Sequence, residues 1–515
     1  MANPPGVNVT VNTPSSSPKT NAATGTWFVT GLTAGGPTGV AVPVNSIQDY
    51  TTYFGTYQNN AVAARTTGFT TLYDALDVYF REGGIRSYVT RAVHANGGVA
   101  ATLTLGTNFV TLTASGPGTW ANSASTSPQG LIVTVATGTA GGITLSVYNN
   151  GIQVGNTSPL LFANTDVQNW VNSLAVPGVL FNVTLNSGTP SLPAAGSYYF
   201  TGGTDVSLSS GIVDSDYQTA AGFFPLALGP GQISVPGVTT QATAVNLIQI
   251  AQNSNRVALL DAVDGAGVDN AAALITTATA IQTSCITGGI DPSYGAQFGP
   301  WIKSPGISTT QPNTIAPVFQ RVIPPTAYVA ANIAFVDNAD DANVPAAGVV
   351  NGSCAYANDV STTYAASERV SLNAAGVNLM RNINGQVSVY GFRSLAADSN
   401  WTAFNNVRFR MQIANDFDVL SEPFVFQEID GKGQVFARLA GVLAGQCQNY
   451  WLRNSLYGVN ASDAYTVNTG PQVNTPATIA AGQINAQVNV RMAPQAEQVS
   501  VTITKYLVSN TLPSY

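Results

Sequence analysis

The chain has 515 residues, a length that the usual size of a domain divides into about three. Charged residues make up only 8% of it, against about 25% in typical soluble domains, and its 18 basic residues are scattered. The net charge of −7 and this scatter argue against a nucleic-acid surface, which needs a concentrated basic footprint.

Asn, Thr, Ser, Gln, Ala and 50 glycines take the place of the missing charge. A surface with so few charges repels its own copies weakly, so it suits a protein that packs against itself. A secreted β-rich protein of similar polarity is the alternative that composition leaves open. Residues 1–6 lack the basic and apolar regions of a signal peptide, and no stretch approaches the roughly 18 apolar residues of a membrane span. We therefore expect a protein of the cytoplasm with no direct membrane insertion.

Both ends of the sequence predict isolated strands. Val7, Val9 and Val11 alternate with polar residues, which is the period of a half-buried strand, and the segment 13–18 that follows has the composition of a flexible linker. Near the other end, Val499, Val501 and Ile503 repeat the alternation. Such strands have no hairpin partner nearby in sequence. They pair either within the monomer or with another molecule, and the pattern alone leaves both possibilities open.

The segment 21–97 predicts mixed α/β structure. Residues 27–31 have the pattern of a buried strand, and residues 46–54 that of a short capped helix. Apolar residues at 72, 76, 79 and 80 predict a helix that ends at Gly83 and Gly84, and residues 87–90 predict the next strand.

The segment 98–205 has a different texture, with short Thr/Val-rich runs at 101–105, 131–135 and 143–148. Asn149-Asn150-Gly151 after the last run is a hairpin signal. From 222 to 404 helices and strands alternate again, with a helix at 244–252, a buried strand at 256–261 and a helix at 271–282, which predicts a sheet covered by helices.

The segment 405–498 contains a strongly amphipathic helix. Its apolar face is predicted to carry Phe436, Leu439, Leu443, Cys447 and Tyr450, and Gly458 lies past its end. The other face carries Arg438, Gln446, Asn449 and Arg453. These four side chains form either a solvated face or a docking surface.

We expect no catalytic residue, cofactor or metal. The single histidine, His94, precedes a Gly-rich turn and has no nucleophile elbow beside it, and Gly431-Lys432 lacks the Ser or Thr of a phosphate loop. Asp337, Asp340 and Asp341 depart from a calcium loop and favour a solvated loop instead. A carboxylate pair for glycoside hydrolysis stays open, because its spacing is a property of the fold.

The three cysteines, Cys285, Cys354 and Cys447, lie far apart and are odd in number. They predict buried free thiols rather than a disulfide framework or a metal site.

Several segments, taken in order, resemble contractile tail sheath proteins of bacteriophages and related injection machines. The matching segments are Pro5-Gly6-Val7 at the start, 35–37 with 53–55, 80–84, 88–92, Pro117-Gly118-Thr119-Trp120-Ala121-Asn122, 299–302, 323–330, 376–378, 390–395 and 494–497. Tyr390 stands where that family usually has Trp, and Arg408-Phe409-Arg410 stands where it often has an Arg pair.

The fold class that follows is a multidomain α+β chain with extended terminal strands. It has an N-terminal arm (1–20), a discontinuous central α/β domain (21–97 plus 206–404), an inserted mostly-β domain (98–205), a C-terminal α+β domain (405–498) and a C-terminal arm (499–515).

The resemblance implies a homo-oligomer of stacked rings in a helical sheath, with a tail tube protein and baseplate and tail terminator proteins as partners and no nucleic acid. It implies a place in the virion, in the contractile tail, after assembly in the host cytoplasm. It also implies that the two arms add strands to sheets of neighbouring subunits, and that Arg438, Gln446, Asn449 and Arg453 face the tube. Another self-assembling protein of a tube, capsid or array is the first alternative, and a β-rich adhesin or glycosidase is the second.

Overall fold

The computed structural model describes residues 24–57, 70–94, 98–173, 180–205, 211–265, 267–307 and 319–497. Contacts divide the chain into two compact units, residues 1–426 and 427–515, which are described separately below. Both terminal strands that the sequence predicts lie outside the described residues. The first unit combines several sheets with helices, so the predicted mixed α+β class is confirmed.

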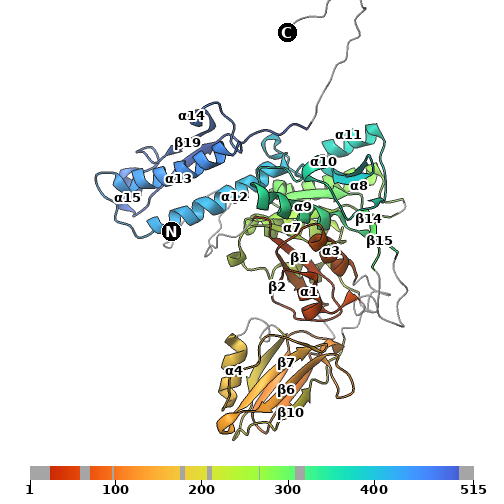
Figure 1. Cartoon of the computed structure of the whole chain (residues 1–515). Helices are drawn as coiled ribbons and strands as arrows, with labels where there is room; N and C mark the ends of the chain where they lie inside the picture. The colour runs from red at the N-terminus through yellow and green to blue at the C-terminus, as the bar shows by residue number, and fades with distance from the viewer. Residues whose placement is uncertain are drawn as a thin grey trace, which may run out of the picture. The chain divides into compact units, whose positions relative to one another are not determined.

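An eight-stranded sheet forms the centre of the first unit (Figure 1). Its strands, in spatial order, are β18 (Gln386–Val389), β17 (Val377–Ile383), β13 (Gly295–Gly299), β12 (Val257–Asp261), β11 (Gln232–Ser234), β1 (Trp27–Gly31), β3 (Ser87–Arg91) and β2 (Val42–Val44). The six inner strands run parallel, and β18 and β2 pair antiparallel at the two edges.

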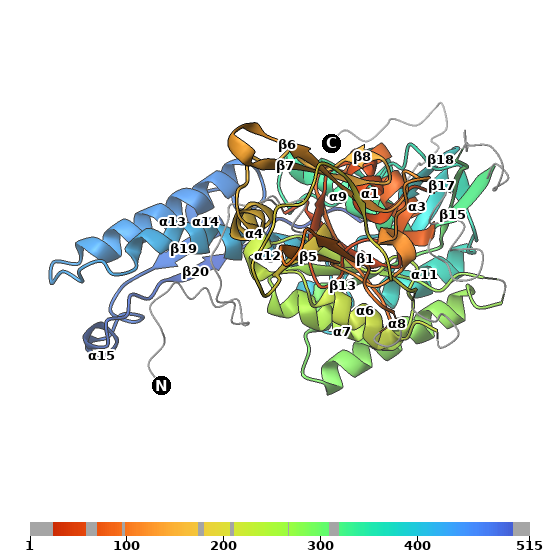
Figure 2. The same cartoon turned by 90° about the horizontal axis from the view of Figure 1, so that it is seen from below.

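Helices cover both faces of this sheet, as its buried strands require. Along β1, Trp27 and Val29 join one apolar core and Phe28 joins the other. The Trp27 side is covered by α1 (Ile47–Phe54), α3 (Thr70–Arg81) and α9 (Pro325–Ala339), and the Phe28 side by α6 (Asp214–Ala221), α7 (Gln241–Asn253), α8 (Ala271–Thr287) and α11 (Ala366–Ala374). Figure 2 shows the two helical layers on either side of the sheet.

The central sheet joins two distant stretches of sequence. β1 pairs directly with β11, through Trp27 with Gln232 and Phe28 with Ile233, although the segment 98–205 lies between them in the chain. The sequence predicted a central domain built from the segments before and after an insertion. The pairing of β1 with β11 lies in the middle of the central sheet. The domain boundaries given above stay a prediction.

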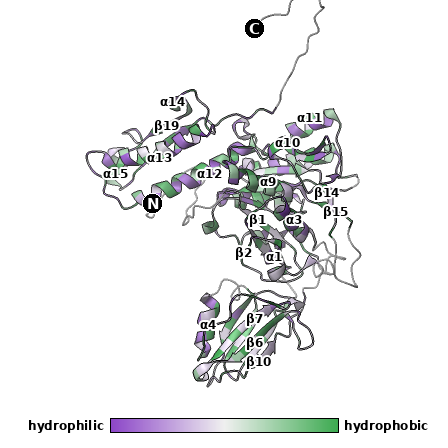
Figure 3. Cartoon of the chain, viewed as in Figure 1, coloured by the Kyte–Doolittle hydropathy of each residue, from purple (hydrophilic) through white to green (hydrophobic). Residues whose placement is uncertain are grey.

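The segment 98–205 folds as two antiparallel sheets and a helix (Figure 3). One sheet is β10 (Gly196–Tyr199), β6 (Leu131–Thr137), β7 (Ile143–Asn149) and β8 (Ile152–Gln153); the other is β4 (Thr102–Leu105), β5 (Val110–Ala114) and β9 (Phe181–Leu185). The helix is α4 (Asn164–Ser173). Buried and exposed side chains alternate along β6 and β7. Asn150 and Gly151 have φ of 50° and 80°, so the predicted hairpin turn between β7 and β8 is confirmed.

Smaller elements complete the first unit. A three-stranded sheet consists of β15 (Gln320–Ile323), β14 (Ile302–Pro305) and β16 (Asp359–Val360), and two more helices are α10 (Gly348–Asn351) and α12 (Phe404–Ser421). The 3-10 turns are Thr119–Ala121, Thr139–Gly141, Leu226–Leu228, Pro292–Tyr294, Ser399–Trp401 and Glu422–Phe424. Phe404 and Val407 of α12 are fully buried in the first unit, although the predicted C-terminal domain begins at 405.

The second unit contains α13 (Gln434–Leu452), α14 (Ala461–Ala464), β19 (Tyr465–Asn468), α15 (Pro476–Ala480) and β20 (Gln487–Val490). The predicted amphipathic helix is α13, and Leu439, Leu443, Cys447 and Tyr450 are buried as expected. The first member of the buried face is Val435 rather than Phe436, which is only partly buried. Val435 lies four residues before Leu439, whereas Phe436 is rotated one position around the helix.

Candidate functional site

The polar face of α13 carries the four residues that the sequence singled out. Arg438 and Asn449 are exposed, Gln446 is partly buried, and Arg453 is exposed at the C-terminal cap of the helix. Arg438 Nη2 donates to Gln427 Oε1 at 2.6 Å. Val442, 38% exposed, lies between Arg438 and Gln446 at four-residue spacing, so the face also offers an apolar contact. Arg438, Asn449 and Arg453 therefore lie on the surface of the second unit.

Among the described residues of the second unit, the sheet has two strands, β19 and β20, which pair antiparallel from Tyr465 with Val490 to Asn468 with Gln487. These strands were not predicted from the sequence, although Gln487-Val488-Asn489-Val490 has the same period-two alternation as residues 7–12. A two-stranded sheet alone is marginally stable in water. It is the element of this unit most open to further strands.

The loop between β19 and β20 is closed by two asparagines. Asn474 Nδ2 donates to Asn485 O at 2.7 Å, and Asn485 N donates to Asn474 Oδ1 at 2.7 Å. Asn474 is 4% exposed, and its Nδ2 also donates to Thr469 O. Tyr465 Oη donates to Gln448 Oε1 at 3.0 Å, which ties β19 to α13. The hairpin is therefore held in place by side chains as well as by its own ladder.

The strand β20 continues beyond its bounds and keeps one edge unbonded. Arg491 N donates to Ala464 O at 2.8 Å, Tyr457 N donates to Arg491 O at 2.7 Å, and Ala493 N donates to Ser455 O at 3.0 Å. Because N–H and C=O of one residue point to the same side, residues 455–457 and β19 occupy the same edge of this strand. Among the described residues no strand pairs with the opposite edge, to which Val488 and Val490 direct their backbone groups.

Two of the sequence motifs meet where the inserted region joins the central sheet. Trp120 packs on Gly35, and Trp120 Nε1 donates to Gly116 O at 3.2 Å. The buried Arg91 guanidinium donates to Gly36 O at 2.7 Å and to Pro117 O at 3.1 Å. Burial lowers the pKa of Arg91 to about 10. This junction is therefore a packed contact held by hydrogen bonds from a buried guanidinium.

The inserted region carries almost no charge. Within 98–205 the only charged residues are Asp166 and Asp205. Asp166 Oδ2 accepts the N–H groups of Phe162 and Ala163, and Asp205 accepts from Thr119 N and Oγ1, each at 2.8 or 2.9 Å. Both carboxylates therefore serve the fold of this region.

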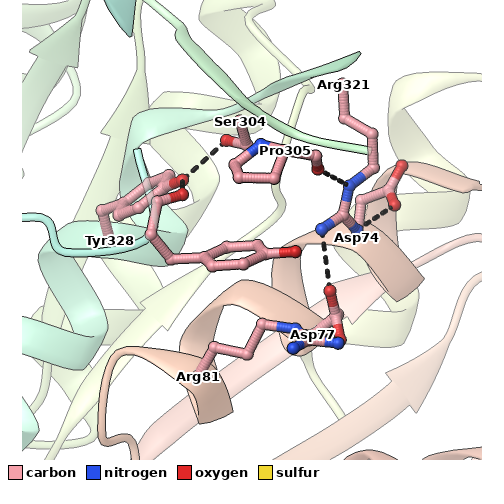
Figure 4. A network of polar contacts seen from close by, with 8 residues as sticks. Asp74, Asp77, Arg81, Ser304, Pro305, Arg321 and Tyr328 are labelled. Carbon is pink, nitrogen blue, oxygen red and sulfur yellow. Dashed lines mark hydrogen bonds and ion pairs between the residues drawn. The ribbon is translucent and has the colours of Figure 1, made fainter. Parts of the chain in front are cut away.

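A buried ion-pair network links α3 to β15 (Figure 4). Arg321 Nη1 lies 2.7 Å from Asp74 Oδ1, and Arg321 Nη2 lies 2.8 Å from Asp77 Oδ2. Arg81, half exposed, reaches Asp77 Oδ1 at 2.9 Å. Nearby, Ser304 Oγ and Tyr328 Oη share a hydrogen bond of 2.6 Å. Asp74 and Asp77 lie on one helix and share the guanidinium of Arg321. These ion pairs form a clamp that holds α3 against β15.

The second conspicuous group of charges is also structural. Arg408 is fully buried and its Nη2 lies 2.5 Å from Asp337 Oδ2, which also accepts from Thr24 Oγ1 at 2.6 Å. Asp337 lies within α9 and Asp341 is 1% exposed, so the predicted solvated loop is wrong for these two residues, whereas Asp340 is exposed just past the helix. Residues 325–334 of α9 are buried all around the helix and only Phe335 among its large apolar residues is exposed, so the helical period was not visible in the sequence. Within the described ranges, no group of His, Cys, Asp and Glu could hold a metal ion.

The remaining candidates for chemistry have structural roles. His94 Nδ1 lies 3.0 Å from Asp216 Oδ2, which joins the end of β3 to α6. Asp430 accepts the N–H groups of Lys432, Gln434 and Val435, so it occupies the donors that a phosphate at Gly431-Lys432 would need. These bonds, chiefly those from Gln434 and Val435, hold the pKa of Asp430 below its usual value.

The three cysteines are free and buried, as predicted. Burial raises the pKa of Cys285 to about 11 and that of Cys447 to about 12, so both thiols stay protonated and unreactive. Among the helices that the structure describes, none has the length and apolarity to cross a bilayer.

No protein-family model and no curated protein matches the sequence. Solved structures do match its fold. A chain of the anti-feeding prophage baseplate aligns with a TM-score of 0.53 at 16% identity and covers 98% of this chain and 100% of that chain. The PVC sheath complex of an extracellular contractile injection system, in the contracted state, aligns at 0.53 and 15% identity, with 98% of each chain covered. The sheath tail protein Lin1278 from Listeria innocua aligns at 0.54 and 13% identity, covering 88% of this chain and 90% of that chain. The fold is the one found in these sheath proteins.

Proposed function

We propose that this chain is the structural subunit of a contractile sheath, which polymerises as stacked rings around an inner tube and contracts to drive the tube through a cell envelope. The main observation behind this proposal is the two-stranded sheet of the second unit. Among the described residues, no strand pairs with one edge of its strand 487–493. An open edge of this kind accepts an added strand through main-chain hydrogen bonds. The fold shared with sheath proteins of contractile injection systems supports the same assignment.

In this proposal, the arms of neighbouring subunits supply the strands that pair with such edges. Val7, Val9 and Val11 at one end and Val499, Val501 and Ile503 at the other place apolar side chains on one face of an extended segment. The linker 13–18 lets rigid bodies rotate while the strands stay paired. A contraction that buries more surface than the extended state needs no nucleotide, so the mechanism requires no bound fuel.

The tube is the proposed partner of the polar α13 face. Arg438, Gln446, Asn449 and Arg453 would contact it, and baseplate and tail terminator proteins would hold the two ends of the assembly. The place of action is the contractile tail of a virion or a related injection particle, with assembly in the host cytoplasm. Charge reversal at Arg438 and Arg453 together should reduce co-assembly with the tube and leave self-assembly of the sheath intact. An unchanged tube content of the assemblies would overturn this assignment of the face.

Electron microscopy of the purified full chain at high concentration tests the proposed function. We expect long hollow tubes wide enough to enclose an inner tube. Deletion of residues 1–18 should leave a folded monomer that does not polymerise, and unimpaired polymerisation of that variant would show that the arm is not the link. A persistent monomer that cleaves polysaccharide would instead support the glycosidase alternative.

Two variants test whether polymerisation needs the alternating valines of the arm rather than only its length. Replacing Val7, Val9 and Val11 by Asn should abolish polymerisation, because strand addition then loses its buried face. The control replaces Asn8 and Asn12 by Thr, which keeps both the length and the apolar row. Loss of polymerisation in the control alone would contradict the predicted register.

A further inference from the structure

The larger sheet of the inserted region, β10-β6-β7-β8, uses only one of its faces for the apolar core. The buried side of β6 and β7 consists of Leu131, Val133, Val135, Ile143, Leu145 and Val147. Because side chains alternate along a strand, the residues between them point to the opposite, outer face. Figure 2 shows β6 and β7 on one side of the inserted region, apart from β5 of the smaller sheet.

The register of the strands places two tyrosines in one row on this outer face. Tyr199 pairs with Ile132, which pairs with Tyr148. Tyr148 pairs in turn with Gln153 of β8. Paired residues point to the same face, so the row crosses all four strands, and its two tyrosines lie two strands apart, about 10 Å. The row therefore offers two partly exposed aromatic rings with an aliphatic side chain between them.

A second row on the same face carries hydroxyl groups. Ser197 pairs with Thr134, which pairs with Ser146. Ser146 Oγ shares a hydrogen bond of 2.8 Å with Thr157 Oγ1. The hydroxyl row lies two residues along the strands from the tyrosine row, about 7 Å away. A hydroxyl both donates and accepts, so this row can exchange hydrogen bonds with a ligand that lies across the tyrosines.

The strands of this sheet contain no charged residue. The two charged residues of the inserted region, Asp166 and Asp205, accept backbone N–H groups at α4 and at Thr119. A charged partner would lose its hydration here and gain no opposite charge, so the face favours a neutral partner. A tyrosine ring packs against the C–H groups of a sugar ring, and sugar hydroxyls bond to the hydroxyls of Ser and Thr.

We propose that this face binds a neutral, β-linked glycan that crosses the four strands. Such a glycan is an extended ribbon, and the separation of Tyr148 and Tyr199 is that of alternate sugars along it. The two rings therefore stack on sugars on either side of the one above Ile132, and the hydroxyl row lies beside the edges of the sugar rings. This inference goes beyond the proposed function, because a sheath needs no sugar in order to polymerise.

Isothermal titration calorimetry of the full chain, kept below the concentration at which it polymerises, tests the ligand class. Cellohexaose and chitohexaose are the probes, since both are neutral and β-linked and only the second carries N-acetyl groups. We expect at least one of them to give saturable heat at millimolar concentration or below. Maltohexaose, whose α linkages coil the chain, is the matched control and should bind more weakly. Failure of both β-linked probes to bind would overturn the proposal, as would tighter binding of maltohexaose.

Substitutions on the face test the position of the site. Tyr148→Ala and Tyr199→Ala should each weaken binding roughly tenfold because each removes a stacked ring, whereas Tyr148→Phe should keep most of the affinity. Thr134→Arg should also block binding, because it puts a long charged side chain in the hydroxyl row and leaves the core side of β6 unchanged. Circular dichroism verifies the fold of each variant. Unchanged binding in the folded variants would contradict the proposed site.

A second aromatic surface supplies the control position. It is a pocket of about 620 Å³ in the second unit, whose lining includes Trp451, Leu452, Tyr457, Val459, Ala493 and Pro494. Tyr457 is 58% exposed, so Tyr457→Ala should leave the fold and the binding of both probes unchanged. Loss of binding in this variant, with normal binding in the Tyr148 and Tyr199 variants, would move the site to the pocket and overturn the proposal.

Polymerisation separates this inference from the proposed function. The Tyr148 and Tyr199 variants should polymerise like the natural chain. If the natural chain binds a β-linked probe and forms no polymer, the proposed function fails and the glycan inference stands. If these variants stop polymerisation and the natural chain binds neither probe, the face is a contact between copies of the chain and the glycan inference fails.

Discussion

Trp120 lies so close to Gly35 that a Cβ added at residue 35 would fall 2.3 Å from the Trp120 Cβ. This contact joins the first loop of the central sheet to the inserted region, and it explains why two separate sequence motifs occur together. Gly35→Ala should therefore lower the free energy of unfolding by about 1–3 kcal/mol, because Trp120 must move. Urea unfolding of the unpolymerised protein measures the change.

A helical glycine with open space is the control for that substitution. Gly441, exposed on α13, has no atom within 4 Å of an added Cβ. Gly441→Ala should raise stability by about 0.5–1 kcal/mol through the lower entropy of the unfolded chain. Equal destabilisation by both substitutions would contradict the role assigned to the Trp120 contact.

Arg321→Met tests the clamp between α3 and β15. It leaves Asp74 and Asp77 buried without their guanidinium, so the free energy of unfolding should fall by about 3–5 kcal/mol. Arg81→Met removes the half-exposed partner of Asp77 and should cost at most about 1 kcal/mol. Denaturant midpoints of the two variants compare them directly. Similar midpoints would show that Arg321 does not hold the two segments together.

The buried Asp261 predicts a pH dependence. Its carboxylate caps α9 by accepting from Thr326 N and Oγ1 and also accepts from Gly237 N, each at 2.9 Å. Burial nevertheless raises its pKa to about 6. Between the unfolded pKa of about 4 and this value, the folded state holds a proton that the unfolded state has released. Its contribution to stability is therefore present below about pH 4 and is lost as the pH rises to about 6, with a slope of at most about 1.4 kcal/mol per pH unit.

Asp261→Asn should reduce this slope, because the amide does not titrate, and the share of Asp74, whose pKa burial also raises to about 6, should remain. Urea midpoints measured from about pH 4.5 to about pH 7 would show it. Asp340→Asn, at an exposed position just past α9, is the matched control and should keep the slope of the natural chain. A slope as steep in the Asp261 variant as in the natural chain would assign the effect to another group.

Proline scanning tests the open edge of β20. Val490 directs its N–H away from β19, so Val490→Pro should leave the monomer folded and still prevent polymerisation. Asn489 is paired with Thr466 and directs its backbone N–H toward β19. Asn489→Pro should therefore weaken the hairpin itself. Circular dichroism and sedimentation together separate the two effects. Polymerisation of the Val490 variant at the natural level would mean that this edge accepts no strand.

The sequence predicted the elements whose periodicity is plain. β1, α1, α3 and α13 are found where the apolar spacing and the capping residues placed them, and Ser46 caps α1 by accepting from Asp49 N. In contrast, α9 gave no helical period because residues 325–334 are buried on every side of the helix. Long-range pairs are a second limit. Arg321 lies 247 residues from Asp74, and no local pattern joins them.

The candidate site was predicted less completely than the fold. The polar face of α13 could be read from spacing alone, because a helix repeats every 3.6 residues. The strands β19 and β20 are four residues each, and an alternation over so few residues is a weak signal for a strand. The pocket beside them depends on residues 451–459 meeting residues 493 and 494, which only the folded hairpin brings about. The role of the arms stays a prediction, because they lie outside the described residues.

The scarcity of charge in the inserted region has a consequence for its resistance to proteases. Trypsin-like proteases cleave after Lys or Arg, and the chain has neither between Arg91 and Arg256. Arg91 is 6% exposed and Arg256 is fully buried beneath Phe28, where its guanidinium lies 3.8 Å from the ring centre. Such an enzyme therefore finds no cleavage point in the inserted region even when that region unfolds, and both flanking points are shielded while the central sheet stays intact.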